Sequence, residues 1–351
     1  MKRRLVLFCL FFVGLLVQKA EAQDPRFSQF YATPVQLNPA MIGVYEGQFR
    51  VVANYRDLYS SILGGRAFRT IAASFDMRYQ IDRGDYLAFG ASVLRDDAGI
   101  SNFNRTQAGL GISVLKQLGG SRYRTSDQYL IAGAQIGFGQ NGADWGALWF
   151  SEQYDLENAV IDQGAASGEN LINNQTDLYL DFNAGLLWYA LFGDDASVYA
   201  GGSLQHINQP SIGFFDDSEE KLPMKWVGHA GGQAPFTDNL SLLPAVAVIG
   251  QGQSMSITAG ANFRFTNRDW RELAIRAGAW AHVTNELDNG MAMDAVIISA
   301  ILEMERWNLG LSYDVTTSTL SRANNSRGAF ELSLIYTHPE KSRYKVNCPN
   351  F

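Results

Sequence analysis

The sequence predicts an all-β protein that closes into one transmembrane β-barrel of about fourteen antiparallel strands. The first observation is an unbroken alternation of polar and apolar residues over Ser254–Arg264, which a strand with one wet face and one apolar face produces. The second is that similar segments recur along most of the chain. The third is strand length, because such segments match the roughly 9–11 residues that a tilted strand needs to cross a bilayer.

The composition favours a barrel over membrane helices. Hydrophobic residues make up 46% of the chain, aromatic residues 12% and charged residues 18%, a mixture typical of strands that face lipid on one side and water on the other. Beyond the N-terminus no run approaches 18 apolar residues, which excludes a helical membrane protein. The formal charge of −7 argues against nucleic acid as a partner.

Residues 1–22 have the features of a signal peptide. Three basic residues at 2–4 precede the apolar run Leu5–Val17, and Ala20–Ala22 forms an A-x-A cleavage site. We expect the mature chain to begin at Gln23, with an uncleaved membrane anchor as the alternative. Cys348 would then be the one remaining thiol, so we expect no internal disulfide.

Turn residues separate the segments that carry the strand pattern. In chain order these segments are Gln48–Arg56, Arg69–Tyr79, Tyr86–Leu94, Phe103–Leu115, Tyr129–Gly139, Leu178–Tyr189, Ser197–Ile207, Met224–Ala234, Leu240–Gly250, Ser254–Phe265, Arg271–Ala281, Met291–Glu303, Arg306–Val315 and Gly328–Thr337. Connections that are long, such as 57–68, 140–177 and 208–223, are expected outside the cell, and the mostly short ones at the periplasmic side.

The two faces of these strands differ in chemistry. Outward positions carry residues such as Phe49, Val51 and Ile71, and aromatic side chains gather at strand ends as interfacial girdles. The inward face carries Asp76, Arg78, Asp181, Asn183, Glu272, Arg276, Asp294, Asp314 and Glu331. Because buried charge must be paired or wet, we expect an arginine–carboxylate network with water or an occupied lumen. The alternatives are a plain solvated wall, and a soluble sandwich with an aromatic core.

No motif predicts catalysis, a cofactor or a resident metal. Gly137–Gly142 matches G-x-G-x-x-G, but no helix follows it as a dinucleotide site requires. The four histidines lack the spacing of zinc ligands, and no G-x-S-x-G occurs. Acidic groups around Asp155 and at 216–220 leave calcium open, although neither has EF-hand spacing. We therefore expect a protein that is not an enzyme, with no catalytic, cofactor-binding or metal-binding residues.

Two segments fit no strand. Residues 23–46 contain Pro25, Pro34 and Pro39, which forbid a long helix or a central strand, so this segment is expected to plug the lumen or to dock on a periplasmic surface. Residues 338–351 form a basic tail beyond the last strand. The predicted organisation is a signal peptide at 1–22, an N-terminal periplasmic or lumen segment at 23–46, a barrel at 47–337 and a periplasmic tail at 338–351.

Short motifs stand in order along the mature chain. They include D-P-x-F-S-Q at Asp24–Gln29, N-P-A at Asn38–Ala40, N-Y-R at Asn54–Arg56, S-Y-D-x-T-x-S-x-L at Ser312–Leu320 and C-P-x-F at Cys348–Phe351. With these motifs in this order, the chain resembles the PorP/SprF family of the type IX secretion system of Bacteroidota. The position before the final Phe, most often Arg in that family, is Asn350 here.

The resemblance implies a fatty-acid-transporter-like, fourteen-strand barrel in the outer membrane that serves secretion and gliding motility without catalysis. Its partners besides outer-membrane lipid would be a periplasmic ring lipoprotein with its companion, or a secreted adhesin with a type-B C-terminal domain. The residues expected to bind partners are Phe27, Ser28, Gln29, Asn38, Pro39, Phe214, Phe215, Arg343, Cys348 and Phe351. The alternative function is a passive or hydrophobic-solute transporter.

Overall fold

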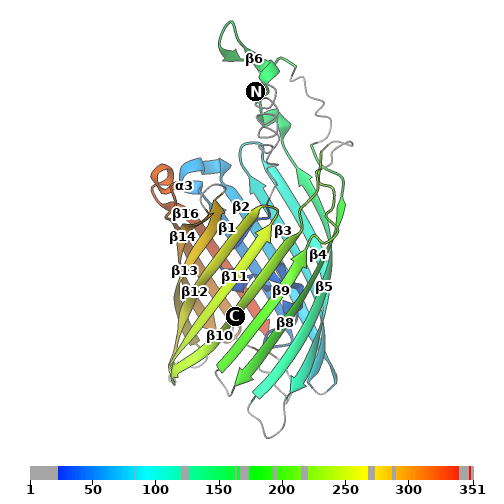
Figure 1. The fold of residues 1–351 in the computed structure, drawn as a ribbon, viewed down its shortest axis with the longest axis vertical. Helices are drawn as coiled ribbons and strands as arrows, with labels where there is room; N and C mark the ends of the chain where they lie inside the picture. Colours follow the sequence, from blue (N-terminus) through cyan, green and yellow to red (C-terminus); the bar gives the residue numbers. More distant parts are fainter. Residues whose placement is uncertain are drawn as a thin grey trace, which may run out of the picture.

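Fourteen antiparallel strands close one barrel within the described residues (Figure 1). This computed structural model describes residues 23–82, 84–119, 126–162, 164–166, 174–192, 196–214, 220–267, 273–286, 290–339 and 348. The first strand, β1 (Phe49–Leu58), pairs with the last, β16 (Arg327–His338), and the remaining barrel strands pair with their neighbours in the chain. The predicted fold class and strand number are confirmed.

The other barrel strands follow in order. They are β2 (Phe68–Asp82), β3 (Asp85–Ala98), β4 (Phe103–Gly119), β5 (Ser126–Gly142), β8 (Tyr179–Phe192), β9 (Ala196–Gln205), β10 (Lys225–Thr237), β11 (Leu240–Gln251), β12 (Ser254–Thr266), β13 (Leu273–Glu286), β14 (Gly290–Met304) and β15 (Trp307–Thr316). A separate hairpin consists of β6 (Tyr154–Asp155) and β7 (Val160–Ile161).

Helical elements are short. They are η1 (Phe30–Ala32), α2 (Pro34–Leu37), η2 (Pro39–Met41), α3 (Ser60–Leu63), η3 (Gly64–Arg66), η4 (Trp145–Ala147), η5 (Ser151–Gln153) and α4 (Ser321–Asn324). None of the helices in the described part of the chain is long and apolar enough to cross a membrane.

Every segment predicted as a strand overlaps one barrel strand, and the differences lie at the ends. The strands predicted to stop at Leu115 and to begin at Tyr129 continue toward each other until Gly119 lies opposite Gln128. Backbone pairing in a hairpin does not depend on apolar side chains, so the ladder runs past the band that the alternation marks. The β6–β7 hairpin lies inside the expected loop 140–177, and strands of two residues are too short to show a period.

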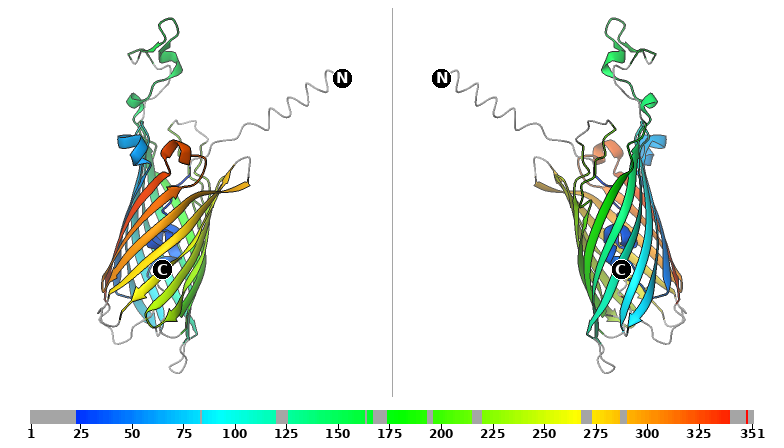
Figure 2. Two further views of the ribbon diagram at one scale, coloured as in Figure 1. Left: turned by 90° about the vertical axis from the view of Figure 1, so that its left-hand side faces the viewer. Right: turned by 90° about the vertical axis from the view of Figure 1, so that its right-hand side faces the viewer.

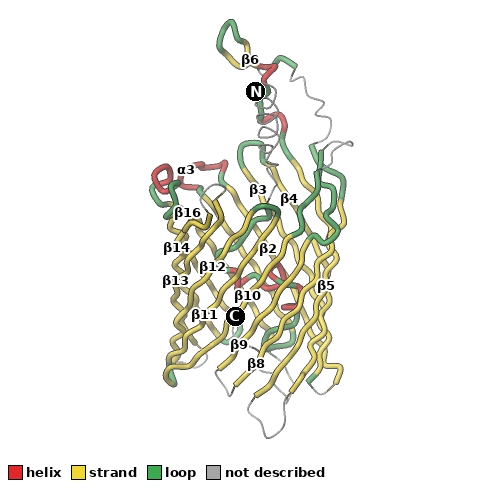
Figure 3. Tube along the Cα trace, viewed as in Figure 1, coloured by secondary structure: helices red, strands yellow, loops and turns green. Residues whose placement is uncertain are grey.

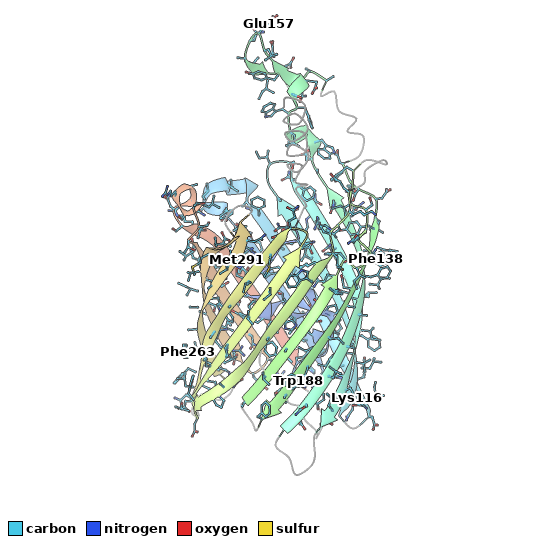
Figure 4. All side chains as sticks on the ribbon, viewed as in Figure 1. Lys116, Phe138, Glu157, Trp188, Phe263 and Met291 are labelled. Carbon is cyan, nitrogen blue, oxygen red and sulfur yellow. The ribbon has the colours of Figure 1, made fainter. Side chains whose placement is uncertain are left out.

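The side chains alternate as predicted between an exposed outer face and a buried inner face. Along β1 the odd residues Val51 and Ala53 are exposed, whereas Arg50 and Asn54 are buried. Phe263, labelled on the outer surface in Figure 4, is 53% exposed. An exposed apolar belt on a closed sheet is the surface that lipid covers, because closure leaves no unpaired strand edge in the bilayer. The protein is therefore a β-barrel of the bacterial outer membrane.

The two ends of the barrel differ in structure (Figures 1 and 3). One end, which we call the loop end, carries α3, α4 and the long connection between β5 and β8. The other end, which we call the turn end, carries short connections, such as those between β2 and β3 and between β14 and β15. The β5–β8 connection rises well above the rest of the rim. We expect the loop end to face the outside of the cell.

A charge on the outer face tests the lipid-facing assignment. Ile298, in the middle of β14, is 58% exposed, and Ile298→Arg should cost about 2–4 kcal/mol of folding free energy in a bilayer. Ile62 on α3, 49% exposed at the loop end, is the matched control, and Ile62→Arg should change stability by no more than about 0.5 kcal/mol. Urea unfolding in lipid vesicles measures both. Equal costs would contradict the assignment of the belt.

Candidate functional site

The lumen is occupied by residues 23–46 of the chain, which we call the plug. Figure 2 shows this N-terminal segment in dark blue within the barrel. The plug runs from Asp24, which contacts the loop-end starts of β4 and β10, through η1, α2 and η2 to the turn end, where the chain enters β1. Residues 28–45 are buried with the single exception of Gln36. Its prolines limit it to single helical turns, which fit inside the narrow lumen.

At the turn end a wall ion pair holds the plug. Arg50 donates to both carboxylate oxygens of Asp76, at 3.0 and 2.8 Å. The same guanidinium donates to the carbonyl oxygens of Met41 at 3.1 Å and Val44 at 3.3 Å, and Asp76 accepts the N–H of Gly43 at 2.8 Å. A buried ion pair needs partners for its remaining donors and acceptors, and the plug backbone supplies them.

Near the N-terminal end of the plug, three buried charges meet two plug residues at the seam where the barrel closes. Arg56 on β1 forms ion pairs with Glu331 on β16, directly opposite it, and with Asp314 on β15 at 3.0 Å. Glu331 accepts the backbone N–H groups of Ser28 at 2.5 Å and Gln29 at 2.9 Å. The Ser28 hydroxyl donates to Asp314 at 2.7 Å and accepts from Arg56 at 2.6 Å. The plug is thus hydrogen-bonded to both strands of the seam.

Asn38 fixes the plug to the opposite wall. Its amide nitrogen donates to the carbonyl oxygens of Leu186 at 3.0 Å and Gly202 at 3.2 Å, and its oxygen accepts the N–H of Ala40 at 2.9 Å. The plug backbone passes so close to the wall here that a Cβ atom at Gly133 would lie 2.5 Å from the nitrogen of Ala40. A glycine is required at that position for this approach.

Aromatic and aliphatic contacts complete the packing. Phe30 meets Trp280 edge-on at 5.5 Å, and Tyr31 stacks on the same ring at 5.3 Å. Val35 and Ile42 are 1% and 0% exposed. Burial of apolar side chains between plug and wall provides a driving force that the hydrogen bonds then orient.

At the loop end the plug terminates in an ionic cluster. Asp24 pairs with Arg105 at 2.7 Å, His206 at 2.7 Å and Lys225 at 3.3 Å, and the other ring nitrogen of His206 lies 2.9 Å from Asp181. Burial opposes ionisation of Asp24, but Lys225, His206 and Arg105 hold its pKa well below the usual range. His206 follows β9, and although burial opposes its charge, Asp24 and Asp181 raise its pKa to about 9.

A cavity lies between the plug and the wall toward the loop end. It has about 1190 Å³ of empty space, part of it open to solvent. Plug residues 23–27 form part of its lining together with wall amides such as Gln107, Gln135 and Asn183. The lining is thus mixed, with apolar side chains such as Phe27 and Phe30 beside the polar ones.

Near the turn end, Cys348 packs against the base of the plug. Its sulfur lies 3.3 Å from Nη1 of Arg78 and 3.3 Å from the carbonyl oxygen of Tyr45, and its backbone N–H donates to Glu46 at 3.3 Å. Cys348 is 6% exposed. The structure therefore places it inside the barrel rather than on the surface of a periplasmic tail.

The structure brings most of the expected partner-binding residues of the N-terminal segment into the lumen. Ser28, Gln29, Asn38 and Pro39 are buried contacts of the plug, and Phe27 is partly buried at the loop-end cavity. The sequence left two places open for this segment, the lumen and a periplasmic surface. In the structure the segment lies in the lumen. A partner cannot contact the buried residues while the plug is seated.

The other residues expected to bind partners do not lie in the plug. Phe214 lies at the loop end, where its ring meets Trp145 at 5.0 Å and Phe103 at 6.4 Å. Phe215, Arg343 and Phe351 lie outside the described residues, as does the signal peptide expected at 1–22.

Sequence reasoning assigned Asp76, Asp314 and Glu331 to the inner face but did not connect them with the plug. Asp24 and Arg56 were visible inside the D-P-x-F-S-Q and N-Y-R motifs. The presence of both motifs in one chain was the signal that could have indicated this contact. In the structure, Arg56 of the second motif donates to the hydroxyl of Ser28 of the first.

Other chemistry weighed from the sequence finds little support in the geometry. Among the described residues, no group of three or more His, Cys, Asp or Glu side chains is placed to hold a metal ion. Gly137–Gly142 lies within β5, in a barrel strand and not between a strand and a helix.

The barrel, and the plug that hydrogen bonds and ion pairs hold inside it, together define a plugged outer-membrane β-barrel protein. Residues 19–336 match the family described as type IX secretion system membrane protein PorP/SprF, and the chain belongs to this family. The family and the fold are those of a secretion-system membrane component and not of an enzyme class. No curated protein matches the chain.

Several solved structures resemble the chain at low identity. A mutant of the TodX monoaromatic hydrocarbon channel has 11% identity and a TM-score of 0.48, with 87% of this chain and 93% of that chain covered. The Acinetobacter baumannii outer membrane protein Omp33 has 10% identity and a TM-score of 0.37, with 84% and 99% covered. A mutant of the Rh. blastica porin has 9% identity and a TM-score of 0.31, with 83% and 99% covered.

The seam cluster predicts a large difference between two arginines. Arg56→Met leaves Asp314 and Glu331 without their cation, and breaking a buried pair in this way should cost about 3–5 kcal/mol. Arg95, which pairs with Asp97 but is 52% exposed, is the control, and Arg95→Met should cost no more than about 0.5 kcal/mol. The urea midpoint of the folded barrel measures both. A cost at Arg56 as small as that at Arg95 would contradict the role of the seam cluster.

The loop-end cluster predicts a pH dependence of stability. The pKa of His206 rises from an ordinary 6.5 to about 9 on folding, so its contribution is complete below about pH 6.5 and is lost as the pH rises through 9. We expect the stability difference between the wild type and His206→Gln to shrink between pH 6.5 and pH 10. Unfolding midpoints at a series of pH values measure it. A difference that stays constant or grows over this window would show that the ion pairs with Asp24 and Asp181 are unimportant.

Proposed function

We propose that the protein is a non-enzymatic component of type IX secretion and gliding motility that binds other proteins of the system. Its partner would be a periplasmic ring subunit or a secreted adhesin with a type-B C-terminal domain, which it would hold at the cell surface. The observation that carries the proposal is the plug, which fills the lumen with the chain's own N-terminal segment and binds it to several wall strands. A lumen that is filled by the chain's own N-terminal segment favours a scaffold that binds proteins over an open pore.

The position of exposed side chains favours the adhesin among these partners. Most of the N-terminal residues expected to meet a periplasmic partner are buried by the plug contacts. At the loop end, in contrast, the β5–β8 connection presents large apolar side chains to solvent, including Trp149 and Leu156. Surface-exposed apolar groups of this kind commonly mark protein interfaces.

The second candidate function, transport of a hydrophobic solute, is favoured by the loop-end cavity. A solute site needs a concave and mostly apolar pocket. The cavity mixes apolar side chains with many amide and charged ones, and plug residues are part of its wall, so the plug would have to move for a solute to pass. We therefore rank transport below protein binding.

Loss of the protein should remove one class of cargo from the cell surface. In a strain without this chain, we expect an adhesin with a type-B C-terminal domain to be absent from the surface by immunofluorescence. Secreted enzymes that lack this domain should be exported at unchanged levels, which serves as the internal control. Normal surface display of every type-B adhesin in that strain would rule out the adhesin as the partner and leave the periplasmic ring subunit.

Bilayer conductance separates the scaffold from the transporter. The wild-type barrel should show no large steady conductance, because the plug occupies the lumen. Gly133→Val should raise the frequency of open events, since its side chain overlaps the plug backbone at Ala40. Ala134→Val, on the exposed outer face of the same strand, is the matched control and should remain closed. A large steady current through the wild type would favour the transporter.

A further inference from the structure

The connection between β5 and β8 projects from the loop end as a separate structure, which we call the tower and define as residues 144–162 and 164–166. Figure 4 labels Glu157 at its tip, at the far end of the molecule from the turn end. The tower contains η4, η5 and the β6–β7 hairpin. Nothing in the plug or the seam requires such a projection, so its shape calls for a separate explanation.

The base of the tower is attached firmly to the rim. Trp145 meets Phe214 of the β9–β10 loop edge-on at 5.0 Å, and Phe214 in turn meets Phe103. The backbone N–H of Asp144 donates to the carbonyl oxygen of Ser101 at 2.6 Å. The tower therefore starts from a fixed point formed by three loops.

The tip is also ordered by its own hydrogen bonds. Asp155 accepts the backbone N–H of Glu157 at 2.8 Å and the side-chain amide of Asn158 at 2.6 Å, which closes the turn between β6 and β7. Below it, Gln153 accepts the N–H of Phe150 and donates to the carbonyl oxygen of Ala165, both at 3.0 Å. These bonds fix the backbone of the turn before any partner arrives, which lowers the entropy cost of binding.

This ordered tip presents apolar side chains to solvent. Leu156, in the turn, is 86% exposed, and Trp149, Tyr154, Val160 and Ile161 are exposed by 40–53%. A two-stranded hairpin is marginal in water without a further surface to pack on. Exposed apolar groups on a soluble projection mark interaction sites, and Trp and Tyr, as at 149 and 154, are enriched among the residues that carry interface binding energy.

The charge around these side chains identifies the kind of partner. Asp144, Glu152, Asp155, Glu157 and Asp162 lie in the tower, and the sequence from 144 to 166 contains no Lys or Arg. Such a surface repels a second copy of this acidic chain and the anionic groups of a lipid surface, and it attracts a basic protein.

We propose that the tower is the docking surface for a basic domain of a secreted protein, with Leu156 inserted into an apolar pocket of that domain. This inference rests on the proposed function, since the secreted adhesin's type-B C-terminal domain is the occupant to which it commits. Carboxylates at the rim of the contact guide the basic domain to the tip, and the apolar side chains hold it.

Binding of a recombinant type-B C-terminal domain from the same cell to the full-length barrel in detergent tests the proposal. Leu156→Ser should weaken the affinity about tenfold or more, as expected for an interface anchor. Ile62→Ser on α3, an exposed isoleucine on the same rim, is the matched control and should bind within about twofold of wild type. The double variant Glu152→Gln/Glu157→Gln should slow association and flatten its salt dependence.

The outcomes separate the two proposals. If the domain binds the wild type and the Leu156→Ser barrel equally well, the tower is not the docking surface although the proposed function stands. If no type-B domain binds the wild type, the adhesin is not the partner, and the docking proposal that rests on it fails as well. A photo-cross-linker at position 156 in intact cells adds an independent readout. An adduct with the type-B domain supports the proposal, and an adduct with a second copy or with lipid overturns it.

Discussion

The contact on which the rest of the structure depends is the pairing of buried wall charges with the backbone of the plug. Arg56, Asp314 and Glu331 face a closed lumen from which bulk water is largely displaced. In that setting an unpaired charge is costly, so each must find an opposite charge or a hydrogen bond. Ser28 and Gln29 provide those bonds at the seam between the first and last strands. The same residues therefore fasten the plug and reinforce the place where the barrel closes.

The chain meets two different solvents, and its surface is divided accordingly. Outside, the strands present an apolar belt that only lipid covers well, as at Phe263 and Ile298. Inside, the wall is polar where it bonds to the plug and apolar where Trp280 receives Phe30 and Tyr31. A porin leaves its inner face to water, whereas here the plug occupies much of that space. The lumen thus serves to hold the plug.

The loop end has a different physical character from the lumen. The plug is held by opposite charges in close contact, as between Asp24 and Arg105. The tower carries acidic side chains with no basic residue among them, beside exposed Leu156 and Trp149. Charges that are paired with opposite charges, as in the plug, stabilise a fixed structure. Acidic side chains without basic neighbours, beside exposed apolar groups, favour binding to a second molecule. The division supports a protein whose interior is structural and whose outer loops make contacts.

The sequence by itself determined the barrel. Alternation with period two depends only on neighbouring residues, so it located every barrel strand and the direction of side chains such as Val51 and Asp76. The order of the motifs was sufficient to identify the family. The tertiary structure alone decided where the segments without a period go. Ser28 contacts Glu331, 303 residues further along the chain, and Cys348 returns to Tyr45. Such pairings leave no local pattern, because they depend on how the closed wall brings distant strands around the plug, and this closure exists only in three dimensions.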